Sequence, residues 1–298
     1  MTGTGKMETT NHTDAERFLG RTQSALESNE AANSLMLGIC GHLIQHPQRF
    51  QTAPCLKTVD DGNGLVLAAL MTPPHNLVVY GHQGDLVGGA RLLIKELVRE
   101  GWSVPGVLGP SQVAQRVATA WTEITGQGHG LQGRQQVFEL RDVIGPLPER
   151  GRLRPATEAD VALVAGWRYA FHQEIWGEAD QTAAERAARE RIGAGDVFLW
   201  EDKQPVSMAM KTRPTRNGIS LTLVYTPPAL RGRGYATACV GALSRLLLDA
   251  GWALCALFAD VANLAANRVY ERVGYRPVCE VDEILFSAGD AHTVLPQM

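Results

Sequence analysis

A glycine-rich loop between a strand pattern and a helix pattern constrains this chain more than any other feature. Apolar and hydroxyl side chains alternate over residues 219–224, which predicts a strand. The loop 225–236 follows, and apolar residues then recur at helical spacing until Gly251. Such a loop brings backbone N–H groups and the positive end of a helix dipole to one point, which favours anion binding. Arg231 and Arg233 add positive charge, so the loop is predicted to hold a diphosphate.

Two common diphosphate loops do not fit these residues. A P-loop needs Gly-Lys-Ser/Thr, and the sequence has no such run. A dinucleotide fingerprint needs a third small residue at the position of Thr237. The loop instead resembles the Arg/Gln-x-x-Gly-x-Gly/Ala signature of the GCN5-related N-acetyltransferase (GNAT) superfamily, which Arg231, Gly234 and Ala236 match.

A second motif strengthens the resemblance. Residues 254–259 form a second apolar strand pattern, and residues 263–275 follow it. The latter resemble the superfamily's Asn-x-x-Ala-x-x-x-Tyr-Glu-x-x-Gly-Phe/Tyr helix at every marked position: Asn263, Ala266, Tyr270, Glu271, Gly274 and Tyr275. The chain is therefore identified as a member of the GNAT superfamily. The implied fold is α/β (α+β), a mixed central sheet flanked by helices.

The resemblance also implies an activity and a site. It implies an N-acetyltransferase that carries the acetyl group of acetyl-CoA to an amine by direct attack in a ternary complex. Tyr270 is implied as the general acid, although its apolar helical neighbours also suit a core aromatic residue. Thr226 stands where an aliphatic residue is usual, which leaves its backbone role intact. The implied cofactor-binding residues are Val224, Tyr225, Thr226, Arg231, Gly232, Arg233, Gly234, Tyr235, Ala236, Thr237 and Asn263.

The general base is not identified by the sequence. Five side chains are candidates: Glu174, Glu178, Asp180, His172 and, on a late strand, Glu283. Each also suits an ordinary solvated or structural role, and a water molecule is a further alternative. Arg268 is either a phosphate contact or a surface arginine. Cys239 and Cys255 lie in apolar periodic segments, which favours buried structural thiols over nucleophiles.

The length of 298 residues suits two domains, and the chain shows a repeat of architecture at an offset of about 150 residues. At that offset Gly81, Gln83 and Gly84 face Arg231, Arg233 and Gly234, while Val113 and Ala120 face Asn263 and Tyr270. The first copy thus lacks the residues that would hold the cofactor. The predicted organisation is a disordered tail (1–13), a degenerate GNAT-like N-terminal domain (14–145), a Gly/Pro-rich linker (146–150) and a catalytic GNAT domain (151–298).

Composition excludes several other classes. A net charge of −3 gives no reason to expect nucleic acid or an anionic membrane surface as a partner. The longest apolar run is too short to span a bilayer, and the N-terminus lacks a signal-peptide core, which predicts a cytoplasmic protein. Five scattered cysteines without a C-x-x-C pair predict neither disulfides nor a metal site. We expect a monomer or homodimer with a small-molecule or peptide amine as acceptor.

Two alternatives stay open at this point. The chain is also compatible with a non-catalytic acyl-CoA-binding regulatory protein, although the presence of Tyr270 and Asn263 favours an enzyme. A tandem acyltransferase of the mycothiol-synthase type, acting on an unusual acceptor, is the other alternative. The acceptor itself is set by loops that carry no transferable code.

Overall fold

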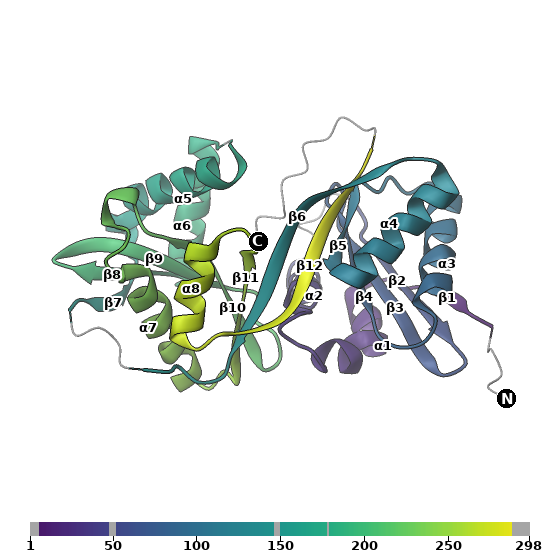
Figure 1. Ribbon diagram of the computed structural model, residues 1–298, viewed down its shortest axis with the longest axis horizontal. Coiled ribbons are helices and arrows are strands. Elements are labelled where there is room, and N and C mark those ends of the chain that lie inside the picture. The colour runs from purple at the N-terminus through teal and green to yellow at the C-terminus, as the bar shows by residue number, and fades with distance from the viewer. Residues whose placement is uncertain (1–5, 48–51, 146–149, 178, 288–298) are drawn as a thin grey trace. The chain divides into compact units, whose positions relative to one another are not determined.

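The computed structural model describes residues 6–47, 52–145, 150–177 and 179–287 (Figure 1). The chain divides into two compact units. Unit 1 consists of Met1–Val137, Arg213–Arg216 and Val278–Met298, and unit 2 of Phe138–Thr212 and Asn217–Pro277. These units are not the two predicted segments 14–145 and 151–298, because the last strand of the chain is counted in unit 1. Most of the predicted linker, 146–149, lies outside the described residues.

The order of helices and strands repeats along the chain. The first copy runs β1 (Glu8–Asn11), α1 (Ala15–Glu27), α2 (Ser34–Gln45), β2 (Cys55–Asp61), β3 (Gly64–Met71), β4 (Leu77–Gly81), α3 (Leu86–Arg99), β5 (Gly106–Pro110), α4 (Ser111–Thr125) and β6 (His129–Leu140). The second runs β7 (Arg152–Pro155), α5 (Val161–Trp176), α6 (Gln181–Gly193), β8 (Val197–Asp202), β9 (Gln204–Thr212), β10 (Gly218–Tyr225), α7 (Tyr235–Asp249), β11 (Leu254–Asp260), α8 (Leu264–Val273) and β12 (Arg276–Phe286). Short 3-10 turns η2 (Glu158–Asp160) and η3 (Pro228–Leu230) precede α5 and α7. The repeat of architecture predicted from the sequence is thus present.

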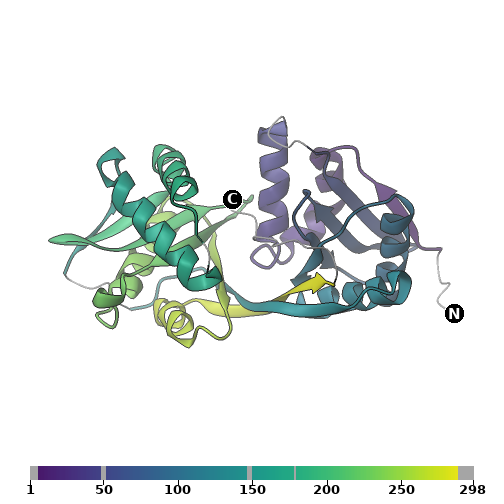
Figure 2. The same ribbon diagram turned by 90° about the horizontal axis from the view of Figure 1, so that it is seen from above.

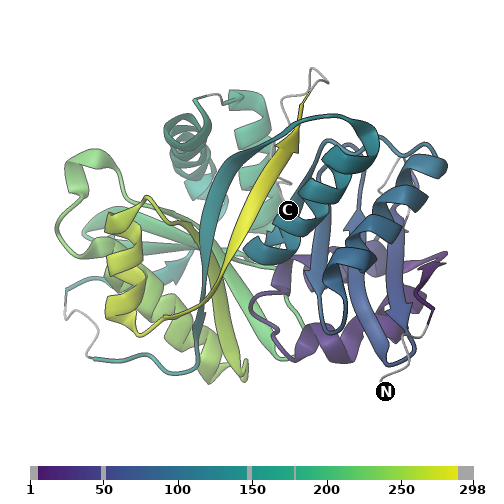
Figure 3. The ribbon, with the colours of Figure 1, turned by 45° about the vertical axis from the view of Figure 1, so that its right-hand side comes forward.

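The two copies exchange their closing strands. The strand order is β1-β2-β3-β4-β5-β12-β6 in unit 1 and β6-β11-β10-β9-β8-β7 in unit 2. In unit 1, β12 lies antiparallel to β5, with Ile284 opposite Val107. Figures 1 and 3 show β6 and β12 side by side. Each closing strand thus lies beside a strand of the other copy, β12 beside β5 and β6 beside β11; residues 129–137 of β6 belong to unit 1 and residues 138–140 to unit 2.

Helices cover both faces of each sheet (Figure 2). In unit 2, α5 and α6 pack on one face through a cluster that includes Val164, Ile192 and Met208. On the other face α7 and α8 pack through a cluster that includes Leu243 and Val273. Burying apolar side chains on both faces is the main source of stability for such a layered sheet. Strand β10 lies between β9 and β11, in the interior of the sheet.

The predicted disorder of residues 1–13 is wrong for part of that segment. Residues Glu8–Asn11 form β1, which pairs antiparallel with β2, Thr9 lying opposite Val59 and Asn11 opposite Lys57. The side-chain oxygen of Asn11 also accepts a hydrogen bond of 2.7 Å from the Lys57 ammonium. An edge strand exposes most of its side chains, so polar composition alone does not distinguish it from a disordered tail.

Candidate functional site

Strand β10 separates from its neighbour halfway along its length. It pairs in parallel with β11 at Gly218, Ile219 and Ser220, whereas both strands continue beyond these residues. On its other side the pairing with β9 shifts register between Thr222 and Tyr225. Leu223 adopts a φ of 51° at this bulge, an uncommon conformation for a branched side chain. The backbone that follows, at Val224 and Tyr225, is therefore exposed toward the gap between β10 and β11.

The helix that follows has an open N-terminus. Gly232 and Gly234 adopt φ values of 76° and 81°, which glycine reaches at low cost, and a Cβ at either position would meet no atom within 4 Å. Gly234 is the N-cap of α7, and no side chain caps that helix in the described structure. The first backbone N–H groups of a helix have no partner within the helix. Together with the dipole they offer an anion site above the two glycines.

The corresponding helix of unit 1 differs at this point. The carboxylate of Asp85 caps α3, accepting hydrogen bonds from Val87 N at 3.1 Å and Gly88 N at 3.0 Å. A negative side chain therefore occupies the position that an anion would take. The residues of the first copy fit a diphosphate poorly for this reason, beyond their lack of arginines.

Most of the predicted site residues line one cavity in unit 2, of about 440 Å³. Its walls come from α5, β10, the glycine loop, α7 and α8. Of the predicted cofactor-binding residues, Arg233 alone is absent from its lining. Those that line it are Val224, Tyr225, Thr226, Arg231, Gly232, Gly234, Tyr235, Ala236, Thr237 and Asn263, together with Tyr270 and Arg268. The structure thus brings together two motifs that are separated by a helix and a strand in the sequence.

The side chain of Arg231 is held at the α5 side of this cavity. Its Nη2 lies 2.7 Å from Oε2 and 2.9 Å from Oε1 of Glu174, and its Nε donates to the carbonyl oxygen of Thr226 at 2.9 Å. The guanidinium carbon lies 5.7 Å from the centroid of the Tyr225 ring. The predicted contact of Arg231 with a diphosphate remains a prediction, and its present partner is a carboxylate.

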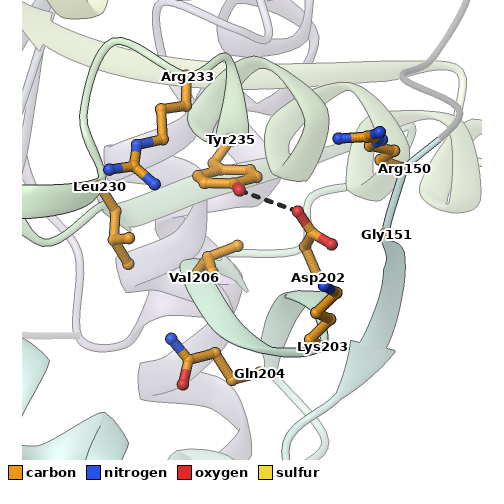
Figure 4. Close-up of a pocket in the computed structure, with 9 residues that line it drawn as sticks. All are labelled: Arg150, Gly151, Asp202, Lys203, Gln204, Val206, Leu230, Arg233 and Tyr235. Atoms are coloured by element: carbon orange, nitrogen blue, oxygen red, sulfur yellow. Dashed lines mark hydrogen bonds between the residues drawn. The ribbon is translucent and has the colours of Figure 1, made fainter.

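The other loop arginine lies in a separate hollow on unit 2, of about 710 Å³ (Figure 4). Arg233 lines this hollow with Arg150, Lys203 and Asp202. Figure 4 shows the hydroxyl of Tyr235 directed at Asp202, to which it donates at 2.9 Å. The two loop arginines therefore line different cavities. Arg233 does not line the cavity that contains the other predicted cofactor-binding residues, so its predicted cofactor contact is not supported by this geometry.

Tyr270 lies deep in the wall of the cavity. Its side chain is 7% exposed and packs against the rings of Phe138 and Tyr275, at centroid distances of 5.9 and 6.0 Å. Burial raises the pKa of Tyr270 to about 12, so the phenol keeps its proton at neutral pH. Both predicted interpretations are compatible with this position, because Tyr270 belongs to the core cluster and also lines the cavity.

Asn263 and the helix it begins form the opposite wall. The side-chain oxygen of Asn263 caps α8 by accepting from Ala266 N at 3.1 Å. This capping role explains an asparagine at the position without reference to a ligand. The predicted hydrogen bond to pantetheine stays a prediction.

The candidate bases lie in different places. Glu174 lines the cavity. Asp180 caps α6 by accepting from Ala183 N at 3.0 Å, and Glu178 lies outside the described residues. Glu283 belongs to unit 1, where it accepts from Asn76 at 2.8 Å and where burial raises its pKa to about 6. His172 is buried, and burial with the nearby Arg168 lowers its pKa to about 4.

Two cavity residues were not anticipated from the sequence. Phe171 and Ile175 lie on α5, one turn before and one residue after Glu174. Together with Tyr225, whose ring Phe171 contacts, they form an apolar and aromatic patch beside Glu174, the only carboxylate among the described residues of the lining. The helical pattern of α5 was visible, but nothing in it marks which end faces β10.

Metal-binding and membrane-spanning features are not found in the described part of the chain. No group of three or more His, Cys, Asp or Glu side chains there is arranged to hold a metal ion. No helix among those residues combines the length and apolar character needed to cross a membrane. Cys239 and Cys255 are buried, and burial raises the pKa of each thiol to about 12, as expected of structural cysteines.

Comparison with known proteins agrees with this geometry. Residues 162–275 match the sequence model described as the acetyltransferase (GNAT) family, a span that contains both motifs. No curated protein matches the chain. Among solved structures, a GCN5-related N-acetyltransferase from Sphaerobacter thermophilus is 15% identical with a TM-score of 0.61, covering 94% of this chain and 95% of the other.

Two further solved structures are similar over nearly the whole chain. A GNAT-family acetyltransferase from Colwellia psychrerythraea is 13% identical with a TM-score of 0.54, covering 94% of this chain and 98% of the other. A tandem GNAT protein from the clavulanic acid biosynthesis pathway is 14% identical with a TM-score of 0.55, covering 95% and 98%. At such identities the likeness concerns the fold. Residues 162–275 of the second copy therefore match the acetyltransferase (GNAT) family, and the fold of the chain as a whole is similar to that of a tandem GNAT protein.

Proposed function

We propose that the protein is an N-acetyltransferase that uses acetyl-CoA and one active site, located in unit 2. One observation carries the proposal. The splayed backbone of β10 and the uncapped N-terminus of α7 open into the same cavity, so one extended ligand with a diphosphate can use both. A diphosphate joined to a strand-like amide chain is the chemistry of CoA.

The residues present fit the cofactor in two ways. The N–H groups at the start of α7 and the open space above Gly232 and Gly234 would hold the diphosphate. The backbone of Val224, Tyr225 and Thr226 would pair with the pantetheine amides. When bound, acetyl-CoA supplies an activated acyl thioester.

The chain's own residues would promote the transfer by position and by proton donation. A backbone N–H at the bulge of β10 would stabilise negative charge that develops on the acyl oxygen. Tyr270 holds a proton at neutral pH and would donate it to the leaving sulfur. The acceptor is an amine that attacks directly, since none of the buried cysteines is available as a nucleophile.

The first copy has a different role in this proposal. Asp85 caps α3 and so excludes an anion from the corresponding position of unit 1. Binding of one acetyl-CoA per chain is the consequence. We therefore propose that the first copy binds no cofactor, which the stoichiometry of acetyl-CoA binding tests.

Calorimetric titration of acetyl-CoA tests the proposal directly. We expect a stoichiometry near one per chain, and loss of binding in Arg231→Ala/Gly234→Asp, because the aspartate adds a negative charge at the N-cap of α7. Arg186→Ala is a matched control on α6, since it removes an exposed arginine outside the cavity lining. Two sites per chain would contradict the role given to the first copy.

A turnover assay distinguishes an acetyltransferase from a non-catalytic acyl-CoA-binding protein. Wild-type protein and the Tyr270→Phe variant are assayed for thiol release from acetyl-CoA with a panel of amines. Release that depends on amine supports the proposal. Binding of acetyl-CoA without turnover of any amine would instead indicate an acyl-CoA-binding regulatory protein.

A further inference from the structure

The charges that line the cavity of unit 2 are unevenly distributed. Glu174 is the only carboxylate among the lining residues that the structure describes, and three arginines line the same cavity: Arg231, Arg268 and Arg272. Glu174 lies on α5 with Phe171 and Ile175, facing Tyr225 of β10. Arg268 and Arg272 thus add positive charge from α8, whereas at the α5 end of the cavity a carboxylate paired with Arg231 adjoins apolar and aromatic side chains.

Two neighbours hold the Glu174 carboxylate. Arg231 contacts both of its oxygens, at 2.9 and 2.7 Å. The hydroxyl of Tyr225 donates to Oε1 at 3.3 Å. Burial raises the pKa of Tyr225, followed by the charge of Glu174, so this hydroxyl remains a donor. The Glu174 carboxylate is therefore held by a neutral hydroxyl donor, Tyr225, and by a cation, Arg231.

The contact with Arg231 is of a kind that exchanges easily. The two side chains are 48% and 42% exposed, and surface ion pairs of this sort contribute little to stability. Arg231 is followed by Gly232, which adopts a φ of 76° and, as a glycine, is able to adopt other backbone conformations at low cost. The same arginine begins the loop that leads to the anion site of α7. A diphosphate at that site carries more negative charge than a single carboxylate.

We propose that Glu174 determines acceptor specificity by pairing with a cationic group of the acceptor, and that Arg231 covers Glu174 until a diphosphate draws the arginine away. The inference rests on the proposed function and extends it to the acceptor. Cofactor and acceptor then bind cooperatively, because the first ligand frees the carboxylate that the second requires. By linkage, the acceptor raises the affinity for the cofactor by the same factor.

The acceptor class follows from the composition of that end of the cavity. A carboxylate beside Phe171 and Ile175 suits an ammonium group carried on a short apolar chain. The acceptor is thus a diamine. One amine loses a proton and forms a new C–N bond while the thioester C–S bond breaks, and the leaving sulfur takes up a proton. The second ammonium keeps its proton and stays paired with Glu174.

Three acceptors with five carbon atoms each test the specificity. They are pentane-1,5-diamine, pentan-1-amine and 5-aminopentanoate, which place a cation, a methyl group or an anion at the far end. We expect kcat/KM to fall in that order in the wild type, by about tenfold at each step. Glu174→Gln removes the preference for the diamine, while its affinity for acetyl-CoA stays within about threefold. Glu185→Gln, the same change at an exposed position on α6, retains the preference. Equal use of the three amines by the wild type, or an unchanged preference in Glu174→Gln, would overturn the inference.

A binding experiment tests the exchange of Arg231 without any turnover. Pentane-1,5-diamine is titrated calorimetrically with and without saturating CoA, which cannot react. We expect CoA to tighten binding of the diamine about five- to tenfold in the wild type. Arg231→Gln tightens binding of the diamine in the absence of CoA and abolishes the coupling. Arg186→Gln, at an exposed arginine on α6 outside the cavity lining, retains it.

The outcomes separate this inference from the proposed function. Absence of acetyl-CoA binding in the wild type would contradict the function itself. Binding of CoA with no coupling to the diamine, or with no binding of the diamine at all, would contradict the inference alone. Equal coupling in wild type and Arg231→Gln would show that Arg231 does not cover Glu174.

Discussion

The hydroxyl of Thr226 lies 2.9 Å from the hydroxyl of Ser207 on the neighbouring strand β9. Ser207 is fully buried and also lies 3.2 Å from the carbonyl oxygen of Tyr225, to which it donates. A threonine directly after β10, where the superfamily usually has an aliphatic residue, is thereby explained. The hydroxyl pair ties the end of β10 to β9 beside the bulge, so the strand end that faces the cavity is fixed by a polar contact.

Replacing this threonine tests the contact. Thr226→Val keeps the shape and leaves Ser207 with one hydrogen bond fewer, so we expect the free energy of unfolding to fall by about 1 kcal/mol. Urea denaturation measures it. Thr222→Val on the same strand is the matched control, because Thr222 is half-buried, and we expect its effect to be within about 0.5 kcal/mol. Equal effects of the two changes would show that the hydroxyl pair contributes nothing.

Tyr270→Phe separates the two interpretations of that residue. As a general acid the phenol would contribute about 10²- to 10⁴-fold to kcat, with KM for acetyl-CoA nearly unchanged. The ring contacts with Phe138 and Tyr275 survive the substitution, so the free energy of unfolding is expected to stay the same. Steady-state kinetics and urea denaturation measure the two effects. An unchanged kcat would assign Tyr270 to the core alone.

The raised pKa of Tyr270 has a consequence at alkaline pH. The folded protein binds this proton up to about pH 12, whereas an unfolded tyrosine releases it near pH 10. The contribution of this proton to the free energy of unfolding is therefore fully present below about pH 10 and is lost as the pH rises toward 12. Tyr270→Phe should remove that part of the alkaline loss. Urea denaturation at a series of pH values from 8 to 11 compares the slopes, and parallel curves would contradict the pKa shift.

A buried lysine gives a stability test in unit 1, to which no catalytic role is assigned. The Lys57 ammonium is 2% exposed and lies 2.8 Å from the Glu100 carboxylate, and the hydrogen bond from Lys57 is the largest cause that holds the pKa of Glu100 below its usual value. Glu100→Ala leaves a buried charge poorly compensated, so we expect a loss of about 3 kcal/mol. Lys57→Met removes the charge itself and should cost less. The reverse order in urea denaturation would refute this account.

The cysteines allow a chemical test of burial. Cys40, Cys55, Cys239 and Cys255 are buried, and burial raises the pKa of each thiol to about 12. Thiolates are the reactive species, so we expect these four to be labelled by iodoacetamide at pH 8 only after denaturation. Cys279 is partly exposed and should react first in the native protein. Mass spectrometry of the labelled peptides assigns each site.

Local signals in the sequence were sufficient to predict much of the fold. The alternation over residues 219–224 predicted β10, and the apolar residues at helical spacing up to Gly251 predicted α7. The glycine loop predicted the strand–helix junction at Gly234, and the asparagine motif predicted α8. In each case the residues that determine the structure are close together in the chain.

Features set by distant partners were not predicted. Alternation of apolar and polar side chains predicts a strand but not the strand it pairs with. The pairing of β12 with β5 and of β6 with β11 was therefore not predicted from the sequence. The same holds for β1, which depends on β2. The contact of Arg231 with Glu174 joins residues 57 positions apart, and the loop motif alone suggested an anionic ligand instead.

The exchange of closing strands sets an order of events during synthesis. Domains usually fold as they emerge from the ribosome, beginning with the N-terminal one. Here strand β5 of unit 1 pairs with β12 (Arg276–Phe286), which is synthesised only after β7 to α8 of the second copy. The sheet of unit 1 therefore stays incomplete at β5 until synthesis of the second copy has reached β12.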